Sequence, residues 1–278
     1  MLKGEVVSGS ALFSVDDESM QTKLWHLKLA HLGERNLKEL YSQKAFGEDK
    51  FQPLEFCEHC VLGKAHRVRF STGEHKKKGT LDYIHLDLWG PAQTATRGGA
   101  RYFLSLIDDY SRKLWVYVLK SKDQVFDVFK TWKALVENQT GKRVKRLRTD
   151  NGLEFCNREF NGFCAKHGIV RHRTVRSIPQ QNGVAERMNR TLLERVRCML
   201  TNAKMSKTFW GEAVVTAAYL INRSPSSAID FKTPEEKWSG NPPKYDHLRI
   251  FGCPAFVHVK EGKLEPRAIK GVFIGYPE

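Results

Sequence analysis

Leu81-Asp-Tyr-Ile-His-Leu-Asp-Leu88, Arg101-Tyr-Phe-Leu-Ser-Leu-Ile107 and Leu114-Trp-Val-Tyr-Val-Leu119 are the three stretches that decide the fold of this chain. Each is short and rich in aromatic and aliphatic side chains, which is typical of β-strands. The connections between them are tight, with Gly98-Gly99 in the first and Asp109-Tyr110-Ser111-Arg112 in the second. The three stretches therefore predict consecutive antiparallel strands.

The hydrophobic pattern changes after the third strand. From Val125 to Val136 apolar residues recur at helical spacing, and Gly141 is placed to end that helix. The next predicted elements are a strand, a helix ended by Gly168, a strand and two more helices: 144–149, 159–167, 169–175, 184–202 and 207–221. Three antiparallel strands followed by alternating helix and strand is the order of the ribonuclease H fold. We therefore expect an α/β core, a mixed five-stranded sheet with flanking helices.

Upstream of the strands, the apolar residues from Lys23 to Tyr41 fit short helices with a break at Gly33. Residues 71–79 are polar, charged and bounded by glycine, so we place a domain boundary there. The predicted parts are a tail or linker, a small helical domain, a linker, the α/β core and a C-terminal extension with a strand pair: 1–22, 23–70, 71–79, 80–238 and 239–278.

The chain has a formal net charge of +15 at pH 7, from 46 Lys and Arg against 31 Asp and Glu. This surplus favours a polyanion as partner, with nucleic acid ahead of an acidic membrane. The longest uncharged apolar run, about Ala213 to Ile221, is roughly half of the ~20 residues that cross a bilayer. The N-terminus is unlike a secretion signal. We therefore expect an intracellular protein without a membrane span, whose six cysteines are thiols or metal ligands.

Three carboxylates stand at the ends of predicted elements. Asp87 lies near the end of the first strand, on the face opposite Leu86 and Leu88. Asp150 ends the fourth strand, and Glu186 falls in the first turn of a helix. A mixed sheet would bring these ends together, and hard oxygen ligands of this kind bind Mg²⁺ or Mn²⁺. Two such ions can activate an attacking oxygen and stabilise a leaving one.

Other acids near this trio are explained without a metal. A tight turn after the second strand accounts for Asp108 and Asp109. Glu154 is interpreted as local support or a DNA contact rather than as a ligand.

Histidines and cysteines gather upstream of the core. His26 and His31 are five residues apart, close to one helical turn, so both can face one point. Cys57 and Cys60 form a Cys-x2-Cys knuckle, and the four side chains complete a closed tetrahedral zinc site. The rival ligands are His59, inside the knuckle, and His66. Because so small a unit has little core of its own, zinc should hold it folded, and a chelator should unfold residues 23–70 selectively.

Thirty-five residues separate Asp150 from Glu186. The surrounding sequences are Arg148-Thr-Asp-Asn-Gly-Leu-Glu-Phe155 and Pro179-Gln-Gln-Asn-Gly-Val-Ala-Glu-Arg-Met-Asn-Arg190, joined by Ile107-Asp-Asp-Tyr-Ser-Arg112 and Phe251-Gly-Cys-Pro254. From about Leu24 to Tyr276 the chain closely resembles the integrase region of copia-type LTR retrotransposons of plants. The resemblance implies a ribonuclease H-like integrase core preceded by an HHCC zinc module.

The resemblance also implies the chemistry. Asp87, Asp150 and Glu186 would hold Mg²⁺ or Mn²⁺, and the HHCC set would hold Zn²⁺. The enzyme would process the 3′ ends of element DNA and join them to host DNA by two-metal phosphoryl transfer. A homo-oligomer on DNA, and a location in a cytoplasmic particle and the nucleus, are expected from the family. Lys76-Lys-Lys78 is too short to be a clear import signal.

DNA contacts are expected from the loop before Glu186 and from basic residues near the carboxylates. The candidates are Gln180, Gln181, Asn182, Arg190, Arg176, Lys145 and Arg148. For Arg190, an ion pair with Glu186 or Glu194 is the alternative.

Two positions depart from the family pattern. Ser177-Ile178 stands where related elements have Tyr-Thr, and Ala30 replaces a glycine before His31, a change that a helix should tolerate. The chain stops at Glu278, where a full polyprotein would continue, so we expect a fragment or a degraded copy. The alternatives to an active integrase are a truncated, inactive nucleic-acid-binding relic and a ribonuclease H-like nuclease or transposase.

Overall fold

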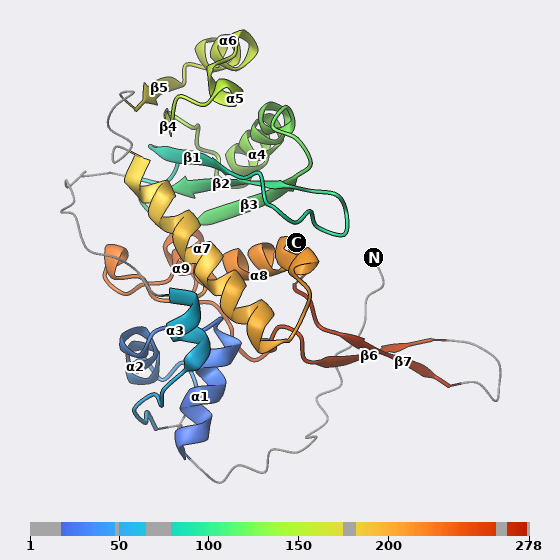
Figure 1. The fold of residues 1–278 in the computed structure, drawn as a ribbon. Coiled ribbons are helices and arrows are strands. Elements are labelled where there is room, and N and C mark those ends of the chain that lie inside the picture. Colours follow the sequence, from blue (N-terminus) through green and yellow to red (C-terminus); the bar gives the residue numbers. More distant parts are fainter. Residues whose placement is uncertain (1–17, 48–49, 65–78, 175–181, 260–265, 277–278) are drawn as a thin grey trace.

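A mixed five-stranded sheet is the centre of the computed structural model, which describes residues 18–47, 50–64, 79–174, 182–259 and 266–276. The strand order is β3-β2-β1-β4-β5, with antiparallel pairing from β1 to β2 and β2 to β3, and parallel pairing from β1 to β4 and β4 to β5 (Figure 1). The strands are β1 (Ile84–Trp89), β2 (Tyr102–Asp108), β3 (Leu114–Leu119), β4 (Arg146–Thr149) and β5 (Val170–Arg173). The predicted sheet and its element order are confirmed.

Three helices cover one face of the sheet: α4 (Gln124–Thr140), α5 (Leu153–Cys156) and α6 (Arg158–Lys166). The opposite face carries α7 (Gly183–Asn202) and α8 (Trp210–Asn222). The sequence predicted one helix over 207–221, but its first turn, Lys207–Phe209, is a 3-10 helix. Gly141 ends α4 in the left-handed conformation, with φ +65°, as the sequence predicted.

Successive side chains along each strand point to opposite faces of the sheet. In β2, Leu104 and Leu106 pack with α4 and α6, whereas Phe103 and Ile107 pack with α7 and α8. In β1, Leu86 joins the first set, so its neighbour Asp87 faces α7. The predicted orientation of Asp87 is therefore confirmed.

The N-terminal helices are α1 (Glu18–Lys28), α2 (Glu34–Ser42) and α3 (Glu58–Lys64). Helix α1 begins inside the segment predicted to be a tail, because its helical residues extend four positions ahead of Thr22. Except for Gly79, the predicted linker 71–79 lies outside the described residues.

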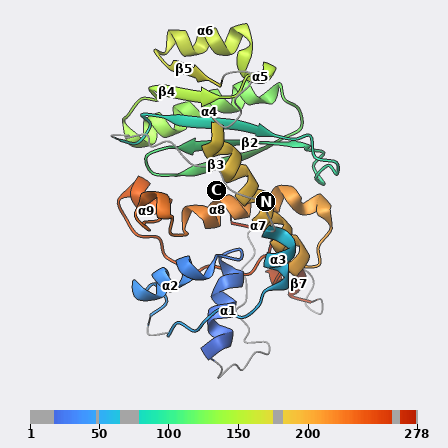
Figure 2. The ribbon, with the colours of Figure 1, turned by 60° about the vertical axis from the view of Figure 1, so that its left-hand side comes forward.

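These N-terminal helices do not form a separate core. Leu29, Leu37 and Leu40 are buried in the same hydrophobic cluster as Leu192 and Val214 of α7 and α8. Figure 2 shows the resulting layers, with the sheet, then α7 to α9, then α1 to α3. The expectation that this small unit has little core of its own is confirmed, because its buried leucines pack against α7 and α8.

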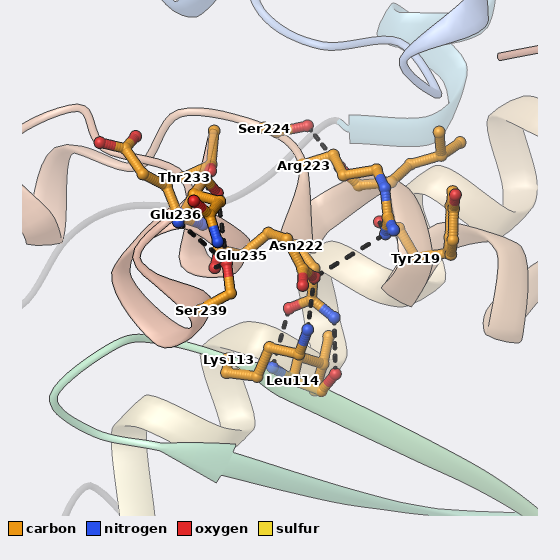
Figure 3. Close-up of polar contacts among 12 residues, drawn as sticks. Lys113, Leu114, Tyr219, Asn222, Arg223, Ser224, Thr233, Glu235, Glu236 and Ser239 are labelled. Carbon is orange, nitrogen blue, oxygen red and sulfur yellow. Dashed lines mark hydrogen bonds and ion pairs between the residues drawn. The ribbon is translucent and has the colours of Figure 1, made fainter. Parts of the chain in front are cut away.

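The edge strand β3 is covered by the end of α8. The Asn222 side chain accepts a hydrogen bond from the Leu114 amide (2.9 Å) and donates one to the Leu114 carbonyl (2.8 Å) (Figure 3). Lys113 forms an ion pair with Glu235 of α9 (Pro234–Ser239). The backbone N–H and C=O groups of Leu114, which face away from the sheet, therefore have hydrogen-bond partners in the Asn222 side chain.

Beyond α9, β6 (Pro254–His258) and β7 (Ala268–Val272) form an antiparallel ribbon that projects from the rest of the fold (Figure 1). This confirms the predicted strand pair beyond the core. None of the helices in the described ranges is long and apolar enough to span a membrane.

Candidate active site and metal centre

Asp87 lies on β1 and is bound by a side chain of α7. Its Oδ2 accepts a hydrogen bond from Asn189 Nδ2 at 2.7 Å. Asn189 is buried, at 4% exposure, and lies one helical turn after Glu186 on the same face of α7. Asn189 was not among the site residues predicted from the sequence; its i+3 spacing from Glu186 was the signal available.

Asp150 and Glu186 approach the same point from two other elements. Asp150 follows β4 directly, and its Oδ1 accepts a hydrogen bond from the Gly152 amide at 3.0 Å. Glu186 lies in the first turn of α7, as predicted, with its side chain exposed. The structure therefore brings the three predicted carboxylates into one region.

The charges of the three groups act on one another. Burial, together with the negative charges of Asp150 and Glu186, raises the pKa of Asp87 to about 7, against the opposing hydrogen bond from Asn189. Burial and the charge of Asp150 also raise the pKa of Glu186, while Arg187 and Arg190 oppose the rise. Carboxylate oxygens are the donors that Mg²⁺ or Mn²⁺ prefers, and a divalent cation would relieve their repulsion, but in this conformation the three side chains do not all lie within 4.8 Å of one another.

A hollow of about 490 Å³ opens beside Asp87 and Glu186. It runs along α7 and is lined by Asp87, Trp89, Gly90, Glu186, Asn189, Arg190, Leu193 and Arg197, among others. Arg190 is exposed in this hollow, which leaves its predicted contact with DNA open to it.

The other predicted DNA contacts are placed differently. Lys145 is exposed but paired with Asp82 at 2.5 Å, and Arg148 donates to the Tyr83 hydroxyl at 3.1 Å. Gln180, Gln181 and Arg176, like Ser177-Ile178, lie outside the described residues.

Asn182 differs from its prediction. Its side chain is 1% exposed, and its Nδ2 donates to the Leu86 carbonyl at 3.2 Å. This hydrogen bond joins the start of α7 to the backbone of β1. The buried Asn182 side chain therefore supports the fold and is not available for a DNA contact in this conformation.

The remaining acids behave as the sequence predicted. Asp108 is buried and accepts hydrogen bonds from the amide and hydroxyl of Ser111, at 2.8 and 2.6 Å. Asp109 pairs with Arg112 at 2.8 Å, within the same turn. Glu154 pairs with Lys122 at 3.7 Å, which is local support.

The four predicted zinc ligands form a second cluster. One ligand atom from each of His26, His31, Cys57 and Cys60 lies within 4.8 Å of the others, and no other such group is found in the described residues. His26 Nε2 is 3.3 Å from Cys60 Sγ and 3.2 Å from His31 Nδ1. His31 Nδ1 is 3.4 Å from Cys57 Sγ. Around tetrahedral zinc, with bonds of about 2.0–2.3 Å, ligand atoms are separated by about 3.3–3.8 Å, so the set fits zinc closely.

The surroundings prepare both imidazoles for a metal. His26 Nδ1 bonds the Leu32 carbonyl at 2.7 Å, which leaves Nε2 as the free nitrogen. Burial, with the nearby charges of His26 and Lys64, lowers the pKa of His31 to about 3, so the ring is neutral, as a metal ligand must be. The rival His59 is not a member of the cluster, and His66 lies outside the described residues.

The two histidines converge by a route that the sequence did not predict. Helix α1 ends at Lys28, and Ala30 and His31 have φ values of +52° and +61°. The chain therefore reverses through two left-handed residues and does not continue as a helical turn. Ala30 is thus not in a helix but at a position that favours glycine.

Comparisons with known proteins found related families, relatives and a solved structure. Residues 80–177 match the family described as integrase core domain, residues 1–65 the GAG-pre-integrase domain, and residues 253–278 the retroviral polymerase SH3-like domain. The retrovirus-related Pol polyprotein from transposon TNT 1-94 of Nicotiana tabacum is 47% identical over 98% of the chain. That from transposon RE2 of Arabidopsis thaliana is 32% identical over 91%. The chain spans 21% and 17% of these two relatives, about a fifth of their length.

A solved structure shares the fold. The chain of a simian T-cell lymphotropic virus intasome, solved in complex with the PP2A regulatory subunit B56 gamma, aligns with a TM-score of 0.50 at 16% identity. The alignment covers 92% of this chain and 87% of that one.

Proposed function

Because the chain belongs to the retroviral and retrotransposon integrase family, with plant copia-type Pol polyproteins among its relatives, we propose that it joins DNA ends by phosphoryl transfer. The proposed reaction is 3′-end processing of element DNA, followed by strand transfer into host DNA. The observation that carries the proposal is that Asp150 and Glu186 lie close enough to Asp87 for their charges, together with burial, to raise the pKa of Asp87 to about 7; burial is the larger cause.

The three carboxylates would hold Mg²⁺ or Mn²⁺. When bound, such ions supply Lewis-acid stabilisation to the attacking and leaving oxygens. Asn189 orients Asp87 through its hydrogen bond, and Glu186 comes from a different element, so the site is assembled by the packing of α7 on β1. The reaction transfers a phosphodiester from one oxygen to another, and no covalent bond to the protein is needed.

DNA is the proposed partner, and Arg190 is the proposed phosphate contact nearest the carboxylates. Its exposure in the hollow beside Asp87 and Glu186, and the net charge of +15, support this assignment. His26, His31, Cys57 and Cys60 are proposed to bind a structural Zn²⁺, supported by the tetrahedral spacing of their ligand atoms.

A strand-transfer and disintegration assay with oligonucleotides in Mg²⁺ or Mn²⁺ tests the proposal. The wild-type chain should give product and Asp150→Asn should give none, while both bind the oligonucleotide equally. Equal product from the two proteins would reject the catalytic assignment. Binding without product from either would favour the alternative of an inactive nucleic-acid-binding relic.

A further inference from the structure

The second zinc thiol, Cys60, is carried by α3, and α3 lies against the C-terminal half of α7 (Figure 1). Two consecutive residues of α7 bind the backbone of α3. Cys198 Sγ donates to the His59 carbonyl at 3.1 Å, and Arg197 Nη2 donates to the Gly63 carbonyl at 2.9 Å. Since His59 lies between Cys57 and Cys60, the first of these bonds holds the knuckle itself.

The contact is close as well as polar. Cys198 is 1% exposed, and a Cβ placed on Gly63 would lie 2.5 Å from its sulfur, closer than real Cβ contacts come. The knuckle therefore reaches α7 only because residue 63 has no side chain and residue 198 has a small one.

Helix α7 is also the helix of the proposed active site. Glu186 and Asn189 lie in its first two turns, and Cys198 lies in its last two. At 1.5 Å per residue, about 18 Å of continuous helix separates Glu186 from Cys198. A displacement of the helix at the zinc end must therefore be absorbed by the packing that places Glu186.

We propose that Cys198 is a positioning residue of the zinc centre, and that with Arg197 it lets the zinc-bound knuckle clamp the catalytic helix α7. This inference rests on the proposed zinc site. When zinc leaves, the knuckle loosens, and the carbonyls of His59 and Gly63 no longer hold α7. By linkage, whatever holds α7 against α3 also strengthens zinc binding.

Zinc affinity of the full chain, measured by competition with a chromophoric chelator, tests the role of Cys198. Cys198→Ala should bind zinc about tenfold more weakly, because it removes a donor next to the ligands. Cys198→Ser keeps a donor of similar size and should stay close to wild type. Cys164→Ala is the matched control, since Cys164 is also 1% exposed but lies on α6, and it should leave zinc affinity unchanged.

A steric test keeps all four ligands. Gly63→Ala should weaken zinc binding, because its methyl group meets the Cys198 sulfur. Adding Cys198→Ala removes that sulfur, so the double variant should bind zinc no more weakly than Cys198→Ala alone. Losses that simply add in the double variant would contradict the contact.

Hydrogen exchange of the wild-type chain provides a readout on α7 that needs no variant. Zinc removal should speed amide exchange in α3 and along α7, including the turn of Glu186 and Asn189. Faster exchange confined to residues 18–64 would overturn the clamp.

Cys57→Ser separates the two proposals. If it binds zinc as tightly as wild type, the zinc site is wrong; if it loses zinc while Cys198→Ala does not, only the role of Cys198 is wrong.

Discussion

At the scale of single residues, the Asp87 carboxylate is where the sheet and α7 meet. It is half-buried near two other acids, and one of its oxygens accepts a hydrogen bond from Asn189. Such an arrangement is unfavourable for the metal-free protein, because repulsion and burial both oppose ionisation of the carboxylate. We interpret the lower stability of the metal-free protein as a consequence of a carboxylate placed to bind metal, since binding sites are often destabilising to the fold.

This interpretation predicts the effect of Asp87→Asn. The folded chain holds a proton on Asp87 up to a pKa of about 7, whereas an unfolded aspartate releases it near pH 4. Without Mg²⁺ or Mn²⁺, wild-type stability is therefore lost as the pH rises from about 4 through 7. Asp87→Asn cannot ionise, so it should melt at a higher temperature than wild type at pH 8, and the gap should close toward pH 4.

Thermal unfolding followed by fluorescence measures this difference. The exposed Asp246 supplies the control, because Asp246→Asn should leave the melting temperature unchanged at both pH values. A wild-type chain that is as stable as Asp87→Asn at pH 8 would contradict the raised pKa.

A second residue-scale prediction concerns Ala30. Its φ of +52° is unfavourable for a residue with a Cβ, but its methyl group is fully buried in the core. Ala30→Gly relieves the backbone strain and loses about 0.8 kcal/mol of methyl burial, so the two effects should nearly cancel. Ala134→Gly, at an exposed position in the middle of α4, should lose about 1 kcal/mol. Urea unfolding measures both free energies of unfolding, and a larger loss in Ala30→Gly than in Ala134→Gly would argue against the left-handed turn.

At the scale of elements, the packing of α8 on the edge strand β3 depends on one buried amide. Asn222 satisfies both backbone groups of Leu114, so α8 completes the sheet edge by hydrogen bonds as well as by apolar contact (Figure 3). A buried backbone group without a partner is unfavourable by about 1–3 kcal/mol.

Asn222→Ala should therefore destabilise the chain by about 2–4 kcal/mol, from two unsatisfied groups of Leu114. Asn202→Ala is a suitable control, because Asn202 is half-buried at the end of α7 and has no side-chain hydrogen bond within the described residues. It should change the free energy of unfolding by about 0.5 kcal/mol or less. Similar losses for the two variants, measured in urea, would argue against a special role for Asn222.

At the scale of the whole molecule, the N-terminal segment that carries the histidine and cysteine cluster shares one hydrophobic cluster with the helices α7 and α8. Leu29, Leu37 and Leu40 pack into it beside residues of α7 and α8. The consequence is that zinc removal should be felt beyond residues 23–70, where the sequence alone predicted a selective effect.

Removal of residues 1–64 tests this shared core. A chain of residues 65–278 should unfold at lower urea concentration than the full chain and should bind a hydrophobic dye in its folded state, because the α1 and α2 side of α7 and α8 is exposed. The full chain is the control for dye binding. Equal stability of the two chains would show that the N-terminal helices form an independent domain.

The sequence by itself determined the order of strands and helices and the three carboxylates that the fold brings together. Hydrophobic periodicity is a local property, and Asp87, Asp150 and Glu186 stand at element ends, so their convergence follows once the sheet order is known. The grouping of His26, His31, Cys57 and Cys60 was also predictable, because thiol and imidazole side chains at such spacing are typical of metal sites.

Only the tertiary structure decided the contacts between elements distant in the chain. The bond from Asn189 to Asp87, the burial of Asn182 behind β1, the left-handed turn at Ala30 and the docking of Gly63 on Cys198 all depend on backbone placement. The pattern of apolar residues predicts which face of a helix is buried, but it does not predict which other element covers that face. For that reason the packing of the N-terminal helices on α7 and α8 was found only in the tertiary structure.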